Sequence, residues 1–163
     1  MILEFRSNIQ AVVYRKLNGK NEFLLAHRIK NWDGWEFVKG GVKVGETHEE
    51  AVKRELQEEA GIKSEDLIKL WKTHFNTIIE YPKNISEKCG YKGSLNKTYL
   101  VEVKNSTEVN LPKNNSEHSE LIWVMENKMK SYLSYSLFSD FLRVKKIIES
   151  YERIYSYALR SNK

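Results

Sequence analysis

The chain is poor in cysteine, on which small secreted domains and small zinc-binding domains depend, and in proline. Its 163 residues include one cysteine, Cys89, and two prolines, Pro82 and Pro112. A single cysteine excludes a disulfide within the chain and a zinc site made of cysteines. No apolar run approaches the roughly 18 residues that cross a bilayer, and the N-terminus lacks a signal-peptide pattern. We therefore expect an intracellular, cytoplasmic protein with no membrane partner.

What the sequence does have is the composition of a globular domain, with 40% hydrophobic and 30% charged residues. This balance excludes a disordered chain, and the length suits a single domain spanning residues 1–163. The net charge is +5. A basic surface favours anionic partners such as polyphosphates or nucleic acids, although it can also serve solubility alone.

A glutamate-rich helix is predicted over residues 48–60. Thr47 and Glu50 form a capping box at its start, and Gly61 supplies the left-handed residue that commonly ends a helix. At about 100° per residue, one side of this helix is apolar and can face a core. The residues on that side are Val52, Leu56 and Ala60.

Glu55, Glu58 and Glu59 are spaced so that their carboxylates converge beside the apolar side of the helix. Taken alone, a charged helix face is most often merely solvated. Three like charges repel one another unless a cation lies between them, and oxygen-only ligands suit Mg²⁺, with Mn²⁺ as a substitute. Glycines at positions 40, 41 and 45 allow a tight loop whose carbonyls are free to bind the same metal.

Together these positions match the Nudix box, G-x5-E-x7-R-E-U-x-E-E-x-G-U with U aliphatic, from Gly40 to Ile62. The chain therefore resembles the Nudix hydrolases, which cleave nucleoside diphosphates linked to another moiety with the help of divalent metal. The resemblance implies Mg²⁺ on the three helix glutamates, in a number of ions that stays open, with the Gly40 carbonyl as a further ligand. It also implies that Glu46 and Arg54 form an internal ion pair that braces the loop and takes no part in catalysis.

The order of elements resembles the Nudix fold, an α/β class α/β/α sandwich with a central mixed β-sheet and the box as a loop–helix–loop. Apolar residues at helical spacing predict an amphipathic C-terminal helix from about residue 136 to 159, packed on the sheet. A turn is predicted at 18–21 and a loop at 82–93. The predicted strands are 9–14, 22–27, 35–38, 67–81, 98–103 and 121–124.

A second acidic position bears on the subclass. Glu117 precedes Trp123 at an offset that resembles diadenosine tetraphosphate hydrolases and RNA 5′-pyrophosphohydrolases, where such a glutamate helps to bind metal or activate water. The stretch from Trp35 to Gly41 resembles their Trp-x-x-Pro-Lys/Gln-Gly segment, with Val38 in place of proline. Among the catalytic glutamates, we favour Glu58 as the general base, although a base outside the box stays open.

Substrate contacts are predicted more loosely. Lys39, His27 and Arg28 are expected near the active face, where they can contact phosphates, although each can also be an ordinary surface residue. The lysines at 83, 88, 92 and 97 form a basic segment that can bind polyphosphate or the 5′ end of an RNA. Aromatic rings commonly stack on nucleobases. The candidates are Tyr81 and Tyr99, together with His74, Phe75, Tyr91 and Tyr132.

The leading hypothesis is Mg²⁺-dependent hydrolysis of a phosphoanhydride bond in a dinucleoside polyphosphate such as diadenosine tetraphosphate. The enzymatic alternatives are an RNA 5′-pyrophosphohydrolase and a nucleoside-triphosphate pyrophosphatase. The alternative from another class is a non-catalytic Nudix module that only binds nucleotides or RNA, which the four intact box glutamates disfavour. The sequence leaves the oligomeric state open.

Overall fold

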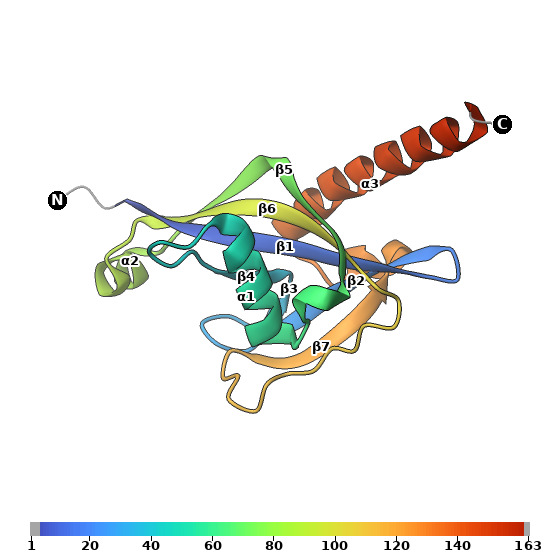
Figure 1. Cartoon of the computed structure of the whole chain (residues 1–163). Coiled ribbons are helices and arrows are strands. Elements are labelled where there is room, and N and C mark those ends of the chain that lie inside the picture. Colours follow the sequence, from blue (N-terminus) through green and yellow to red (C-terminus); the bar gives the residue numbers. More distant parts are fainter. Residues whose placement is uncertain (1–3, 162–163) are drawn as a thin grey trace.

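The computed structural model describes residues 4–161, with side chains to residue 157, so residues 1–3 and 162–163 of the predicted domain lie outside it. A mixed seven-stranded sheet lies between α1 on one face and α3 on the other (Figure 1). The elements are β1 (Phe5–Leu17), β2 (Lys20–Arg28), β3 (Gly34–Glu36), β4 (Val38–Gly41), α1 (His48–Ala60), η1 (Ser64–Asp66), β5 (Leu67–Glu80), α2 (Lys83–Cys89), β6 (Gly93–Val103), β7 (His118–Met125), η2 (Glu126–Ser131) and α3 (Tyr135–Ser161).

The sheet is organised around β1. Its strand order is β3-β2-β1-β6-β5, with β4 also paired to β1 and β7 to β2. The β1–β6 pair is parallel, whereas the other pairs are antiparallel. The predicted α/β/α sandwich with a central mixed sheet is confirmed. Among the helices of residues 4–161, none is long and apolar enough to cross a membrane.

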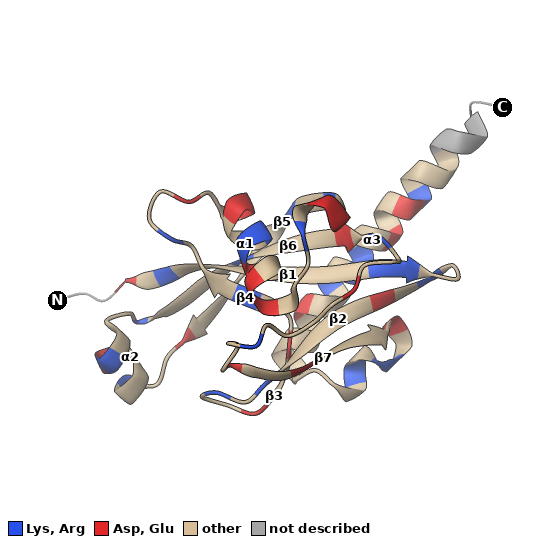
Figure 2. Cartoon of the chain, turned by 60° about the horizontal axis from the view of Figure 1, so that its bottom comes forward, with Lys and Arg blue, Asp and Glu red and all other residues tan. Residues whose placement is uncertain are grey.

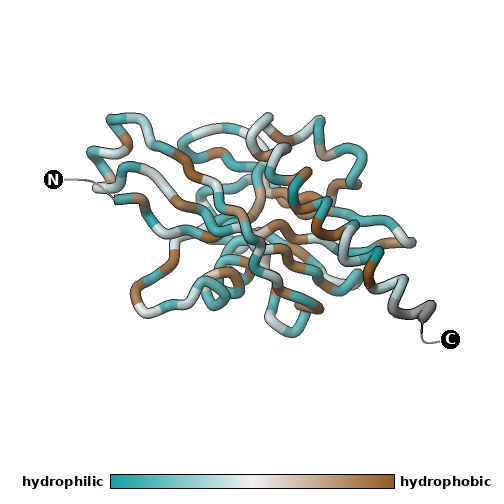
Figure 3. The backbone as a smooth tube through the Cα atoms, turned by 90° about the horizontal axis from the view of Figure 1, so that it is seen from above, coloured by the Kyte–Doolittle hydropathy of each residue, from teal (hydrophilic) through white to brown (hydrophobic). Residues whose placement is uncertain are grey.

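Two apolar cores lie on opposite faces of the sheet, because side chains of β1 alternate between them. Ile9 and Val13 pack towards α1, and Val12 packs towards α3. Figure 3 shows apolar and polar residues alternating along α3, which is the pattern of a helix that rests one face on a sheet.

The α1 helix begins and ends where the sequence predicts. Thr47 Oγ1 accepts the Glu50 N–H at 3.2 Å, and the Glu50 carboxylate accepts the Thr47 N–H at 2.8 Å. Gly61, with φ 68°, ends the helix in the left-handed conformation. The apolar side of α1 is buried against the sheet, as predicted. Its glutamates are therefore held at fixed places relative to β3 and β4.

Two predictions of local structure are wrong. The segment 35–38 is not one strand, because Phe37 separates β3 from β4 and its ring enters the core beneath α3. The segment 82–93 is not only a loop, because it contains α2. Pro82 precedes the first turn of α2, where its fixed φ is favourable, and Gly90 ends the helix with φ 77°. The turn at 18–21 is confirmed, with positive φ at Asn18 and Gly19.

Candidate active site

Arg54 of α1 organises the loop between β4 and the helix. Its guanidinium donates to both carboxylate oxygens of Glu46 at 2.7 and 2.9 Å and to the Gly41 carbonyl at 2.8 Å. It also donates to Glu55 at 2.6 Å and Glu58 at 3.0 Å. Hydrogen bonds from this guanidinium and from a backbone N–H lower the pKa of Glu46 to about 2. The loop is thereby tied to the helix that carries the three carboxylates.

Gly40 allows the carboxylate of Glu55 to lie directly against the backbone of β4. A Cβ at this position would lie 1.9 Å from Glu55 Cδ, so any other residue would displace the carboxylate. Glu55 is buried, and burial raises its pKa despite the charge and hydrogen bond of Arg54. The Glu55 carboxylate is therefore in close contact with the backbone of Gly40.

Glu59 is a buried carboxylate whose charge is poorly compensated. Its Oε2 atom is buried and has no hydrogen-bond partner within the described part of the chain. Burial, followed by the negative charges of Glu55, Glu36 and Glu117, raises its pKa to about 8. An ionised Glu59 therefore requires positive charge from outside the chain, which a bound cation can supply.

Glu36 is a buried ionic centre that sequence reasoning missed. It accepts hydrogen bonds from Arg28 at 2.8 Å and from His118 at 3.1 Å, and the Lys39 ammonium lies 2.7 Å away. Burial alone would raise its pKa, but the hydrogen bond from His118 and the two cations outweigh burial and lower the pKa to about 2. The available signal was a charged residue inside the apolar stretch 35–38.

Glu117 lies at the same edge of the sheet as this centre. Its carboxylate accepts from Arg28 at 3.0 Å and lies 3.4 Å from the Lys30 ammonium. Arg28 therefore bridges Glu36 and Glu117. The charge of Glu117 also reaches Glu59, whose pKa it helps to raise. Figure 2 shows the resulting mixture of acidic and basic residues around α1 and β3.

The residues fit a divalent cation, although the present contacts of Glu58 and Glu117 are to arginine and lysine side chains. Within residues 4–161, no three acidic, histidine or cysteine side chains converge as ready metal ligands. Glu58 contacts Arg54, and Glu117 contacts Arg28. The unpartnered buried oxygen of Glu59 lies among like charges, and the donors are all oxygens, which is the chemistry that Mg²⁺ prefers.

The predicted base-stacking residues fall in different places. Tyr99 is only 3% exposed and lies in the core beneath α1, so its assignment to substrate binding is corrected. Tyr81 lies between β5 and α2, and its backbone N–H donates to the Lys92 carbonyl at 3.0 Å. The His27 ring contacts the Trp35 ring in a tilted arrangement, with 4.7 Å between ring centroids, and Trp35 meets the exposed Tyr132 ring edge-to-face at 5.6 Å.

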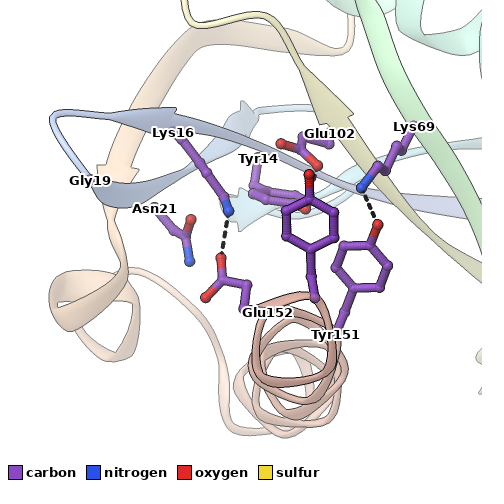
Figure 4. A pocket seen from close by; sticks show the side chains of 9 residues that line it. Tyr14, Lys16, Gly19, Asn21, Lys69, Glu102, Tyr151 and Glu152 are labelled. Carbon is purple, nitrogen blue, oxygen red and sulfur yellow. Dashed lines mark hydrogen bonds and ion pairs between the residues drawn. The ribbon is translucent and has the colours of Figure 1, made fainter. Parts of the chain in front are cut away.

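A pocket of about 480 Å³ lies between the β1–β2 hairpin and the C-terminal half of α3 (Figure 4). Its polar groups contact one another: Lys16 lies 2.7 Å from Glu152, Tyr14 donates to Glu102, and Lys69 donates to Tyr151. None of the box glutamates lines it. The catalytic candidates therefore lie elsewhere, at the edge formed by α1, β3 and β4.

Comparison with known proteins identifies the class. The NUDIX domain family matches residues 7–139, so the chain belongs to this family and is a hydrolase. Several relatives bear the name RNA pyrophosphohydrolase, and two of them illustrate the match. The one from a Sulfurovum species is 34% identical over 112 residues, 66% of this chain and 68% of the relative. The one from a Nitratiruptor species is 30% identical over 135 residues, 80% of this chain and 84% of the relative.

Among solved structures, a C. elegans Ap4A hydrolase in a binary complex superposes with a TM-score of 0.70 at 27% identity. The match covers 89% of this chain and 98% of that one. The predicted resemblance to the Nudix hydrolases, and to the branch that holds these two kinds of enzyme, is confirmed.

Proposed function

We propose that this Nudix hydrolase cleaves a phosphoanhydride bond at the triphosphorylated 5′ end of RNA, in a reaction that depends on a divalent cation. The observation that carries the proposal is an unpartnered buried carboxylate, Glu59, within reach of the charges of Arg28 and Glu36, where Glu36 in turn holds both Arg28 and Lys39. Carboxylates that need a metal and cations that suit phosphates thus share one edge of the fold. The two relatives named RNA pyrophosphohydrolase support the choice of RNA.

The cation in this proposal is Mg²⁺, or Mn²⁺ in its place. Glu55, Glu58 and Glu59 would hold it, with the Gly40 carbonyl and Glu117 as further ligands. Bound there, it neutralises phosphate charge and lowers the pKa of an attacking water.

The side chains of the protein bind and orient the substrate. Arg28 and Lys39 bind phosphate oxygens, and because both contact Glu36 they are already in position before substrate arrives. Glu58, whose side chain is 52% exposed, is the proposed general base that accepts the proton of the attacking water. Arg54 and Glu46 keep the loop closed against α1.

A dinucleoside polyphosphate such as diadenosine tetraphosphate is the second candidate substrate. The superposition on the Ap4A hydrolase supports it. Both substrates present a phosphoanhydride to the same carboxylates and differ only in the leaving half.

The test is hydrolysis of 5′-triphosphorylated RNA, diadenosine tetraphosphate and ATP by the wild-type protein, with and without Mg²⁺. Glu58→Gln is the inactivating variant, and Glu65→Gln is the matched control, since Glu65 is an exposed acid outside the box. Turnover of RNA with the highest kcat/KM, abolished in Glu58→Gln only, supports the proposal. A higher kcat/KM for the dinucleotide would select the second candidate. No turnover of any substrate would leave a binding module.

A further inference from the structure

We propose that Trp32, in the β2–β3 loop, is the platform on which the nucleobase of the substrate stacks. This inference rests on the proposed function and assigns a specificity determinant to the same site. Neither sequence resemblance nor the box motif indicates this residue.

Trp32 is the tryptophan left without a ring partner in the described part of the chain. Trp35 contacts His27, Trp71 contacts Tyr151, and the Arg15 guanidinium lies 4.2 Å from the Trp123 ring centroid. Trp32 has no such contact among residues 4–161 and is 41% exposed. An indole ring is large and apolar, and an open ring face is the feature that stacks on a planar ligand.

The Trp32 ring lies on the backbone of Gly34. A Cβ on Gly34 would come within 2.2 Å of Trp32 Cζ3, so the ring occupies the place of that side chain. Side chains in a strand alternate, so Gly34 and Glu36 face the same side of β3, about 7 Å apart along the strand. Arg28 is the Cα partner of Gly34 in β2. The ring therefore lies on the side of the sheet that carries the Glu36 centre.

The loop that carries Trp32 is anchored to the candidate active site at several points. The Ile29 N–H donates to the Glu117 carbonyl at 2.9 Å, and Arg28 Nε donates to the Lys30 carbonyl at 3.0 Å. The Asp33 carboxylate lies 3.1 Å from His27 Nε2. Because the loop is already ordered, stacking on the ring costs little additional conformational entropy.

An open aromatic ring beside a phosphate-binding arginine is the arrangement that a nucleotide requires. Arg28 takes a phosphate oxygen, and the ribose spans the gap to a base that rests on Trp32. Stacking uses the face of the base, which every base has, so this contact distinguishes nucleotides from other polyphosphates without distinguishing one base from another.

The experiment compares KM and kcat for ATP and for ribose 5-triphosphate, which lacks the base. Trp32→Ala should raise the KM for ATP about tenfold, equivalent to about 1.4 kcal/mol, with kcat within about twofold. The KM for ribose 5-triphosphate should not change. Trp32→Phe should retain most of the affinity for ATP. Tyr155→Ala is the control, because Tyr155 is an exposed ring, 56% accessible, at the distant pocket.

An unchanged KM for ATP in Trp32→Ala would overturn the inference. An equal increase in KM for both substrates would also overturn it, because Trp32 would then only support the loop. Nucleotide binding is followed separately by tryptophan fluorescence in EDTA, with quenching expected in the wild type and lost in Trp32→Ala. If the wild type hydrolyses nothing, the proposed function fails, and the fluorescence titration still decides whether a base stacks on Trp32.

Discussion

Replacing Glu59 by glutamine should change how the stability of the metal-free protein depends on pH. The pKa of Glu59 is about 8 in the folded chain, against an ordinary value of 4.5, because burial and three neighbouring carboxylates disfavour its charge. The native state therefore holds this proton more tightly than the unfolded chain does. The free energy of unfolding consequently falls as pH rises from about 4.5 to about 8, and levels off above that.

The size of the effect follows from the shift. Between pH 6 and pH 9 the native carboxyl of Glu59 loses its proton, while the unfolded carboxyl is ionised throughout. At about 1.4 kcal/mol per pKa unit, this contribution lowers the free energy of unfolding by about 3 kcal/mol. Glu59→Gln removes the titrating group, so this part of the pH dependence should disappear. Mg²⁺ should also remove it in the wild type, by compensating the charge.

The assay is urea denaturation in EDTA at pH 6 and pH 9, for the wild type, for Glu59→Gln and for the control Glu65→Gln. The two-pH difference should be about 3 kcal/mol smaller in Glu59→Gln than in the wild type, and unchanged in the control. The reasoning is refuted if the change in the free energy of unfolding between pH 6 and pH 9 agrees within about 0.5 kcal/mol between the wild type and Glu59→Gln, because Glu59 would then titrate normally.

Four further outcomes are expected. Glu58→Gln should lower kcat by about 10²- to 10⁴-fold with an unchanged circular dichroism spectrum, and near-normal turnover would remove it from the mechanism. Gly40→Ala should displace the Glu55 carboxylate and lower kcat/KM about a hundredfold, and an unaltered value would show that the close approach is dispensable. Arg54→Ala leaves three carboxylates without this partner and should lower the free energy of unfolding, measured by urea denaturation, by about 3 kcal/mol. Glu117→Gln should raise the Mg²⁺ concentration for half-maximal rate, and an unchanged requirement would make Glu117 a surface acid.

The α1 helix could be predicted closely because its signals are local. Thr47, Glu50 and Gly61 are cap residues that act within one turn of the chain, and the spacing of the glutamates fixes their face. The α2 helix was missed although Pro82 and Gly90 have helix-end geometry, because the same residues are equally typical of loops.

The Glu36 centre could not be predicted because it depends on strand pairing, which brings Arg28, eight residues away, and His118, 82 residues away, to the same carboxylate. Arg28 on β2 and His118 on β7 approach Glu36 only through the pairing of β2 with both β3 and β7. Strand register also decides the position of Tyr99, which the sequence suggested as a substrate contact. Its ring appears available in the sequence, but the register of β6 turns it beneath α1. Residue type suggests chemistry, while pairing decides which side chains meet.

The parallel pairing of β1 with β6 also has a consequence for how the chain folds. Tyr14 and Glu102, which pair across these strands, are 88 residues apart in sequence. Closing so long a loop before its contacts form is entropically unfavourable, so the central pair should form late and slow the folding of the molecule. A fragment that ends after the box would contain every glutamate of α1 and yet lack the strands that hold β1 and β2 in place. The motif is contiguous in the chain, but its shape is a property of the whole sheet.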